Sequence, residues 1–403
     1  MPPNEAAVPP LTPNYLRPCL GLDAHKGSIT ATELGPGGQF VKSWTLATTR
    51  AEVLALAATA GLSLPVVVEA STAGKAVAGV LKEVGCDLHM AAPNMIPKPA
   101  VKTDVKDSLR LAQLYQSGSL PECYVPPPEI EYLRLLVRGR RDLADKVVLV
   151  KNQVHALVTR NLLDSAMEES SDWFGVGGLR KLVRLPLSVV ERNHLARLLE
   201  QLELLAQQEE RMQTELAKIA SDRKDVQLLM TIPGIGYYSA VGLVAEIGDI
   251  HRFASKQKLA SYAGVVPRAD NSGERVAEHR PVKKGNTMLK GFLCCGVKAM
   301  LKANHPTAVA AFYREKAKSQ PAQKATVSAA RKLSAEIWKM LTFEVEYREE
   351  DAGLSDRKEK AMRKVAEQSV VVTTPEDLDR LADRLTGKTD VLRILEEEVA
   401  DVG

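Results

Sequence analysis

The fold of the first third of the chain follows from the stretch Cys19-Leu-Gly-Leu-Asp-Ala-His-Lys26. Its short apolar run ends at Asp23, and after a tight connection comes the alternating run Ser28-Ile-Thr-Ala-Thr-Glu-Leu34. Alternation of apolar and polar residues is typical of a half-buried strand. Two such runs joined by a short connection predict a hairpin with an aspartate at its mouth.

Three further acids occupy comparable places. Glu69 closes a second apolar strand, Leu64-Pro-Val-Val-Val-Glu69. Asp104 and Asp107 are three residues apart on a predicted helix, so their side chains leave the same face. Taken singly, each acid is an ordinary surface carboxylate, but a solvated acid is not expected at the end of an apolar strand.

Carboxylates grouped in this way indicate metal-assisted phosphodiester chemistry. Hard cations such as Mg²⁺ prefer carboxylate oxygens. Two such ions about 3.5–4 Å apart stabilise the attacking and leaving oxygens of a phosphodiester. We therefore expect a site for Mg²⁺ (or Mn²⁺) whose ligands are Asp23, Glu69, Asp104 and Asp107.

Length and composition set the class of protein. A chain of 403 residues is long enough for two or three domains. Its five cysteines are odd in number and show no CxxC spacing, which disfavours a disulfide framework or a zinc site and fits a reducing, cytoplasmic location. No run of 18 apolar residues occurs, so no membrane association is expected. Residues 1–17 are Pro-rich and predict a disordered tail.

Charge is distributed unevenly. Residues 349–403 contain 15 acids and 9 Lys/Arg, a net charge of −6, whereas the whole chain carries +4. The preceding 348 residues therefore carry +10, which is compatible with a polyanionic partner.

Residues 18–125 alternate strand and helix patterns. Strands are predicted at 18–23, 28–35, 39–46, 64–69 and 87–92, and helices at 49–61, 73–85 and 104–118. Three consecutive strands followed by helix–strand alternation predict a mixed sheet covered by helices. A meander with an acid on its first strand and another acid ending the fourth is the layout of RNase H-like folds.

Residues 126–225 predict a stalk of long helices. The first helix, over 129–163, has a basic face that is expected to contact nucleic-acid phosphates through Arg134, Arg138, Arg140 and Arg141. The second carries a heptad seam from Leu195 to Ile219 with one polar position, Glu209. This seam is explained equally well by packing within one chain and by an intermolecular coiled coil.

Residues 226–345 open with Thr231-Ile-Pro-Gly-Ile-Gly236, a turn that leads into a helical pattern. As in helix-hairpin-helix modules, backbone N–H groups at Gly234 and Gly236 could bind a phosphate, although simple turn chemistry explains the glycines as well. Downstream, Ser272 lies in Asn271-Ser-Gly273, a pattern that is ordinarily a plain turn. The cations that follow it include Arg275, Lys283 and Lys284, so the Ser272 hydroxyl is placed where it could attack a phosphodiester. Residues 346–403 predict an acidic helical extension.

In order along the chain, five motifs resemble those of the DEDD-type insertion-sequence transposases, relatives of the Piv/MooV DNA invertases. The motifs are Gly21–Lys26, Val66–Ser71, Lys102–Asp107, Pro233–Gly236 and the segment from Tyr262 through Ser272 to Asn286. The resemblance covers roughly residues 18–345. One departure is Ser108, which stands where a small apolar residue is expected.

The resemblance implies a multidomain α/β plus α protein. A RuvC-like domain with an RNase H fold would span 18–125, a coiled-coil region 126–225, and a mostly helical, serine-bearing transposase domain 226–345. Asp23, Glu69, Asp104 and Asp107 would bind the metal, and Ser272 would form a phosphoserine link to DNA. The implied partners are donor and target DNA, a structured bridge RNA and further copies of the chain, as a dimer or tetramer.

A second enzyme class fits the same acids. A metal-dependent, structure-specific endonuclease would cleave DNA junctions by hydrolysis and would not need Ser272. The two readings differ in one product, because the transposase reaction leaves a covalent protein–DNA adduct and hydrolysis does not.

Overall fold

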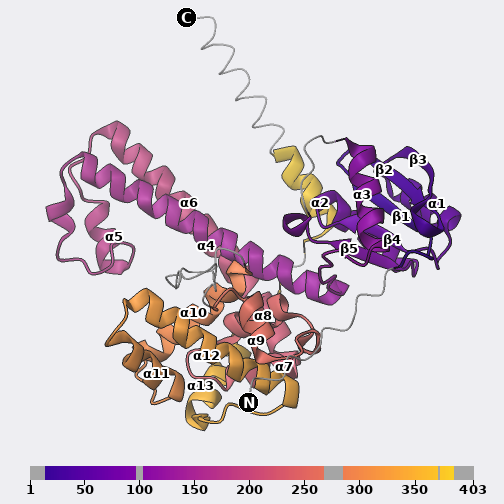
Figure 1. Ribbon diagram of the computed structural model, residues 1–403. Coiled ribbons are helices and arrows are strands. Elements are labelled where there is room, and N and C mark those ends of the chain that lie inside the picture. Colours follow the sequence, from indigo (N-terminus) through magenta and orange to yellow (C-terminus); the bar gives the residue numbers. More distant parts are fainter. Residues whose placement is uncertain (1–13, 97–102, 267–284, 371–372, 385–403) are drawn as a thin grey trace, which may run out of the picture. The chain divides into compact units, whose positions relative to one another are not determined.

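The computed structural model describes residues 14–96, 103–266, 285–370 and 373–384. The chain divides into two compact units, Met1–Pro126 and Pro127–Gly403, which are shown in Figure 1. Residues 1–13 of the expected tail lie outside the described residues, as does the segment that contains Ser272, Arg275, Lys283 and Lys284.

The first unit contains one five-stranded sheet. Its strands are β1 (Cys19–Ala24), β2 (Ser28–Leu34), β3 (Phe40–Ala47), β4 (Val66–Glu69) and β5 (Leu88–Ala91), in the order β3-β2-β1-β4-β5. β2 is antiparallel to both β1 and β3, whereas β4 is parallel to both β1 and β5. The predicted mixed sheet is confirmed, with every strand boundary within two residues.

Three helices cover the sheet: α1 (Arg50–Ala60), α2 (Thr72–Glu83) and α3 (Asp104–Gln116). Each begins at a hydroxyl side chain that accepts a hydrogen bond from the first turn. Alternate residues of a strand face opposite sides. Accordingly, Leu20 and Leu22 pack in the core of α1 and α2, whereas Cys19 packs in a second core with α3.

The second unit is helical. Its helices are α4 (Pro128–Arg160), α5 (Val176–Leu182), α6 (Val189–Asp222), α7 (Lys224–Met230), α8 (Tyr237–Ile247), α9 (Lys256–Tyr262), α10 (Thr287–Lys302), α11 (Ala308–Ala317), α12 (Ala322–Phe343) and α13 (Ala352–Ala366). Within the described parts of the chain, none of the helices combines the length and apolar character needed to cross a bilayer.

α4 and α6 run side by side as a long helical hairpin (Figure 1). The predicted seam of α6 faces α4: Leu195 and Leu198 share a buried cluster with Val154, and Leu216 lies in the core that contains Leu133. Its polar position, Glu209, forms an ion pair with Arg140 of α4. The heptad pattern is therefore used for packing within the chain.

A single core joins the three segments into which the sequence divides residues 126–403. This core contains Val137 of α4, Leu243 of α8, Leu333 of α12 and Met362 of α13, all fully buried. Although acidic overall, the C-terminal extension thus contributes to the interior through α13.

Lys358 of α13 holds the turn between α7 and α8. Its ammonium donates hydrogen bonds to the carbonyl oxygens of Ile232 (2.9 Å), Ile235 (3.1 Å) and Met230. Burial lowers the pKa of Lys358 to about 8. An ammonium group has three N–H donors, so this cradle of three carbonyls satisfies it completely.

We predict that Lys358→Met lowers the free energy of unfolding by about 1–3 kcal/mol, because buried carbonyls lose their donor. Urea unfolding followed by far-UV circular dichroism, which the helical second unit dominates, measures this change. Lys360→Met, at an exposed position of the same helix, serves as the control and should leave the unfolding curve unchanged. Equal stability of the two variants would contradict a clamping role for Lys358.

Candidate active site

The candidate site lies at one end of the central strands. Asp23 is the penultimate residue of β1 and Glu69 is the last residue of β4. In the parallel pairing of these strands Leu22 is opposite Val68, so the two acids, one residue further along, lie at the same edge of the sheet. The parallel pairing of β1 with β4 brings Asp23 and Glu69 to one edge of the sheet. The sequence predicts a mixed sheet but does not specify this pairing.

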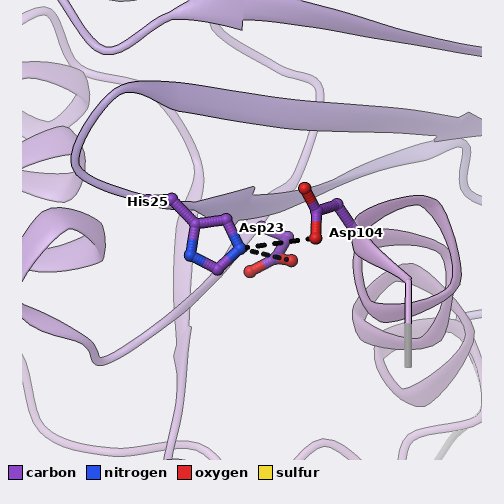
Figure 2. A group of neighbouring side chains, drawn as sticks. All are labelled: Asp23, His25 and Asp104. Atoms are coloured by element: carbon purple, nitrogen blue, oxygen red, sulfur yellow. Dashed lines mark ion pairs between the residues drawn. The ribbon is translucent and has the colours of Figure 1, made fainter. Parts of the chain in front are cut away.

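Asp104 approaches Asp23 from the first turn of α3, and His25 approaches it from the connection between β1 and β2 (Figure 2). The His25 Nε2 atom lies 3.2 Å from Asp23 Oδ2 and 3.6 Å from Asp104 Oδ1. One ligand atom from each of the three residues falls within 4.8 Å of the others. Two carboxylate oxygens and an imidazole nitrogen form a donor set that suits a divalent cation such as Mn²⁺.

Close packing of α3 on the sheet sets this geometry. A Cβ atom at Gly21 would lie only 2.0 Å from the Ser108 carbonyl oxygen, so α3 can approach β1 this closely only because residue 21 is glycine. The Ser108 hydroxyl is buried and lies 2.7 Å from the hydroxyl of Thr32, which in turn lies 3.0 Å from that of Ser43. The departure noted at Ser108 thus has a structural reason, because its hydroxyl bonds α3 to β2.

Burial and charge act together on Asp23. Its side chain is 13% exposed, against 57% for Asp104. Burial raises the pKa of Asp23, His25 acts to lower it, and the charges of Asp104 and Asp107 raise it further. The site therefore contains more negative charge than its own residues neutralise, which favours a bound cation.

Glu69 and Asp107 lie near this group but outside it. Among the described residues, the set of ligand atoms within 4.8 Å contains neither of them. Asp107 stands half-buried one turn after Asp104 on α3. The backbone of Glu69 is tightly packed, since a Cβ atom at Gly74 would lie 1.9 Å from its carbonyl oxygen.

His25 is not among the residues that the sequence predicts for the site. The residue lies two positions after Asp23 in the hairpin connection, where its backbone N–H donates to the Ser28 carbonyl oxygen (2.9 Å). A histidine so close to a strand-ending acid was the one available indication of its place in the site.

The arginines of α4 mostly have partners inside the second unit. Arg134 donates to the carbonyl oxygens of Ala245 (2.8 Å) and Glu246 (3.3 Å). Arg138 pairs with the buried carboxylate of Glu246.

The other two arginines of this set differ in exposure. Arg140 pairs with Glu209 and lies over the ring of Tyr238, 4.2 Å from its centroid. Arg141 pairs with Asp145 at the exposed surface, which leaves it the most accessible of the four.

The two glycines of the α7–α8 turn differ in role. Gly234 has a φ of +87°, and a Cβ atom there would lie 2.7 Å from the Gly296 carbonyl oxygen, so turn conformation and contact with α10 account for it. Gly236 is exposed at the start of α8, where no side chain caps the helix. Gly236 is the more exposed of the two, so the predicted phosphate contact remains a prediction for Gly236.

Comparison with protein families covers both units. A family model described as "Transposase", of the DEDD type of IS110, matches residues 20–162. A second, described as "Transposase IS116/IS110/IS902 family", matches residues 226–314. The first match contains all four predicted acids, and the second contains Ser272.

Curated relatives are similar over parts of the chain. A protein of Coxiella burnetii, "Transposase for insertion sequence element IS1111A", is 32% identical over 33% of this chain and 37% of its own length. A "Probable family 20 transposase" of Pseudomonas aeruginosa is 26% identical over 66% of this chain and 81% of its own. The "Pilin gene-inverting protein" of Moraxella bovis is 52% identical over 46 residues, 11% of this chain and 14% of its own.

The aligned share of these relatives varies widely, and the chain spans about a third of the Coxiella protein and about half of a putative transposase of Sinorhizobium fredii. The two family models are nevertheless matched in order and in the two parts of the chain where the sequence motifs lie. The protein therefore belongs to the DEDD-type insertion-sequence transposases of the IS110 family.

Proposed function

We propose that this chain is a transposase that cleaves and exchanges DNA strands under RNA guidance, through a covalent phosphoserine intermediate and with the help of a divalent-metal carboxylate site. The observation that carries the proposal is the convergence of Asp23 and Asp104 at the carboxyl end of β1. In a sheet of this kind such an edge is where catalytic residues are placed.

The sheet supports a nuclease of the RNase H and RuvC kind. Three antiparallel strands followed by two parallel ones, with acids on the first and fourth strands and on the following helix, agree with the expected layout. We propose on this basis that Glu69 and Asp107 complete the metal site with Asp23 and Asp104. Mg²⁺ or Mn²⁺ would polarise the scissile phosphate and stabilise the charge that builds on its oxygens.

Ser272 is proposed as the nucleophile. Its Oγ forms a bond to phosphorus, its proton passes to a base, and the bond between phosphorus and one DNA oxygen breaks, so that this strand end leaves with the electron pair. Arg275 and Lys284 would offset the negative charge of the pentacovalent state. A second strand end then attacks the phosphoserine, which restores the serine and joins the exchanged strands.

The proposed partners are donor and target DNA, a structured bridge RNA and further copies of the chain. Since the seam of α6 packs on α4 within the chain, a dimer or tetramer would have to use other surfaces or a rearranged helical hairpin. The acids and the serine belong to different compact units, which is compatible with a composite site formed by two chains.

We predict that the chain binds Mn²⁺ and that Asp23→Asn abolishes this binding, because Asp23 is the more buried of the two carboxylates that converge there. Asp104→Asn should weaken it by about tenfold or more, the loss expected when a metal site is disturbed. Calorimetric titration with Mn²⁺ measures both. Glu52→Gln, at an exposed acid of α1, is the matched control. Full Mn²⁺ affinity in Asp23→Asn would refute the proposed metal site.

We predict that Ser272→Ala eliminates the covalent protein–DNA adduct and recombination while RNA binding persists. Without the hydroxyl no phosphoserine can form, whereas the surfaces that bind RNA remain. Denaturing gels with labelled DNA detect the adduct. Cleavage by Ser272→Ala at the normal rate without an adduct would support the hydrolytic endonuclease instead, and an adduct that persists would place the nucleophile elsewhere.

We predict that Arg141→Gln weakens nucleic-acid binding and lowers the slope of log affinity against log salt by about one, as expected for one lost phosphate contact. Arg134→Gln should instead lower stability, because Arg134 bonds two backbone carbonyls. Salt titrations of RNA and DNA binding separate the two. An unchanged slope in Arg141→Gln would mean that this face of α4 is merely solvated.

A further inference from the structure

The second unit contains one fully buried carboxylate among its described residues. Glu246 lies near the end of α8 and its side chain is 0% exposed. Its neighbours along the helix, from Ala240 to Ile247, are buried as well. Burial of a charge costs free energy unless the charge is paired and hydrogen-bonded, so the partners of Glu246 indicate the role of its carboxylate.

Both oxygens of Glu246 are bonded. Arg138 of α4 donates from Nε to Oε1 (3.0 Å) and from Nη2 to Oε2 (3.1 Å). Asn286 donates from Nδ2 to Oε2 (2.7 Å). The arginine contact is bidentate, which fixes the plane of the carboxylate and thereby the direction in which Oε2 meets Asn286.

Asn286 is the hub of this network. Its Oδ1 accepts a hydrogen bond from the Leu289 N–H (3.0 Å) and caps α10, while its backbone N–H donates to the Tyr262 carbonyl oxygen (2.8 Å). Its Nδ2 is also 3.2 Å from the Tyr262 hydroxyl. Asn286 therefore ties the start of α10 to the end of α9 through backbone and side chain together.

The two backbones next to these residues are in direct contact. Gly285 has a φ of +141°, and a Cβ atom there would lie 2.7 Å from the Cα atom of Gly264. Residues 264 and 285 are thus adjacent in space, although 20 residues lie between them in the sequence. Ser272 lies between these two residues in the sequence, in the segment 267–284 outside the described residues.

We propose that Glu246 is a positioning residue: by orienting Asn286, it holds together the two ends of the segment that carries the nucleophilic Ser272. The inference rests on the proposed role of Ser272. An ordinary structural ion pair would need only Arg138 and Glu246, and an apolar pair would be less costly to bury. Glu246 has a third partner, Asn286, which bonds to Oε2. This bond connects the buried carboxylate to one end of the segment that contains Ser272.

The sharpest variant is Asn286→Asp. Aspartate keeps the cap of α10, because a carboxylate oxygen accepts the Leu289 N–H as well as an amide oxygen does. It replaces the Nδ2 donor, however, with an oxygen that faces Glu246 Oε2, so two negative charges oppose each other. Asn152→Asp, on an exposed face of α4, introduces the same charge elsewhere and serves as the control.

We expect Asn286→Asp to speed hydrogen exchange of the residue 286 amide and to slow adduct formation by about 10–100-fold at saturating DNA, the range for a misplaced reacting group. RNA affinity should stay unchanged. The double variant Glu246→Gln with Asn286→Asp moves the charge and reverses the hydrogen bond between the two positions, but its new amide nitrogen also faces Arg138 Nη2, so it should recover part of both losses. The control should behave as the unmodified protein.

Two results would overturn the proposal. One is a folded Asn286→Asp variant whose amide exchange and adduct rate are unchanged. The other is a double variant that regains thermal stability but not the adduct rate, which would assign the network to folding alone. The exchange measurement needs no catalysis, so a protein that forms no adduct even unmodified would refute the proposed function and leave the anchoring role testable by itself.

Discussion

The contact between α3 and β1 at Gly21 is the constraint on which the acid site depends. Without a Cβ atom at this position, the helix lies at backbone distance from the strand. The hydroxyl contacts from Ser108 through Thr32 to Ser43 fix which face of α3 meets the sheet. Metal–oxygen distances are about 2.0–2.6 Å, so a shift of one ångström between Asp23 and Asp104 would change what the site can bind.

The second unit relies on polar groups inside an apolar core. Glu246 meets Arg138 and Asn286, and Lys358 meets three carbonyl oxygens, in both cases across 40 or more positions of sequence. Such groups tolerate burial only when their partners are nearly complete. They bond α4 and the start of α10 to α8, and α13 to the turn between α7 and α8.

The basic face of α4 illustrates that a run of charged residues in the sequence does not by itself show which groups those charges bind. A helix with arginines at 134, 138, 140 and 141 is rightly expected to be basic, but its partners decide what the charges do. Three of these side chains bond groups on other helices of the unit, whereas Arg141 is paired with an exposed acid of its own helix. A surface ion pair of that kind contributes little to stability.

Much of this protein was predictable from local patterns. Alternation and helical periodicity located β1 to β5 and α1 to α3 of the first unit, because burial on one face leaves a period of two or about 3.6 residues in the sequence. The motifs likewise indicated Asp23 and Asp104. Tertiary structure alone decided that His25 joins them, that Ser108 is bonded to Thr32, that the α6 seam packs on α4, and that Glu246 meets Asn286. Some of these pairings join residues far apart in the chain, and others depend on the direction of a side chain. A local sequence period encodes neither the long-range contact nor the side-chain direction, because both depend on how whole helices and strands pack.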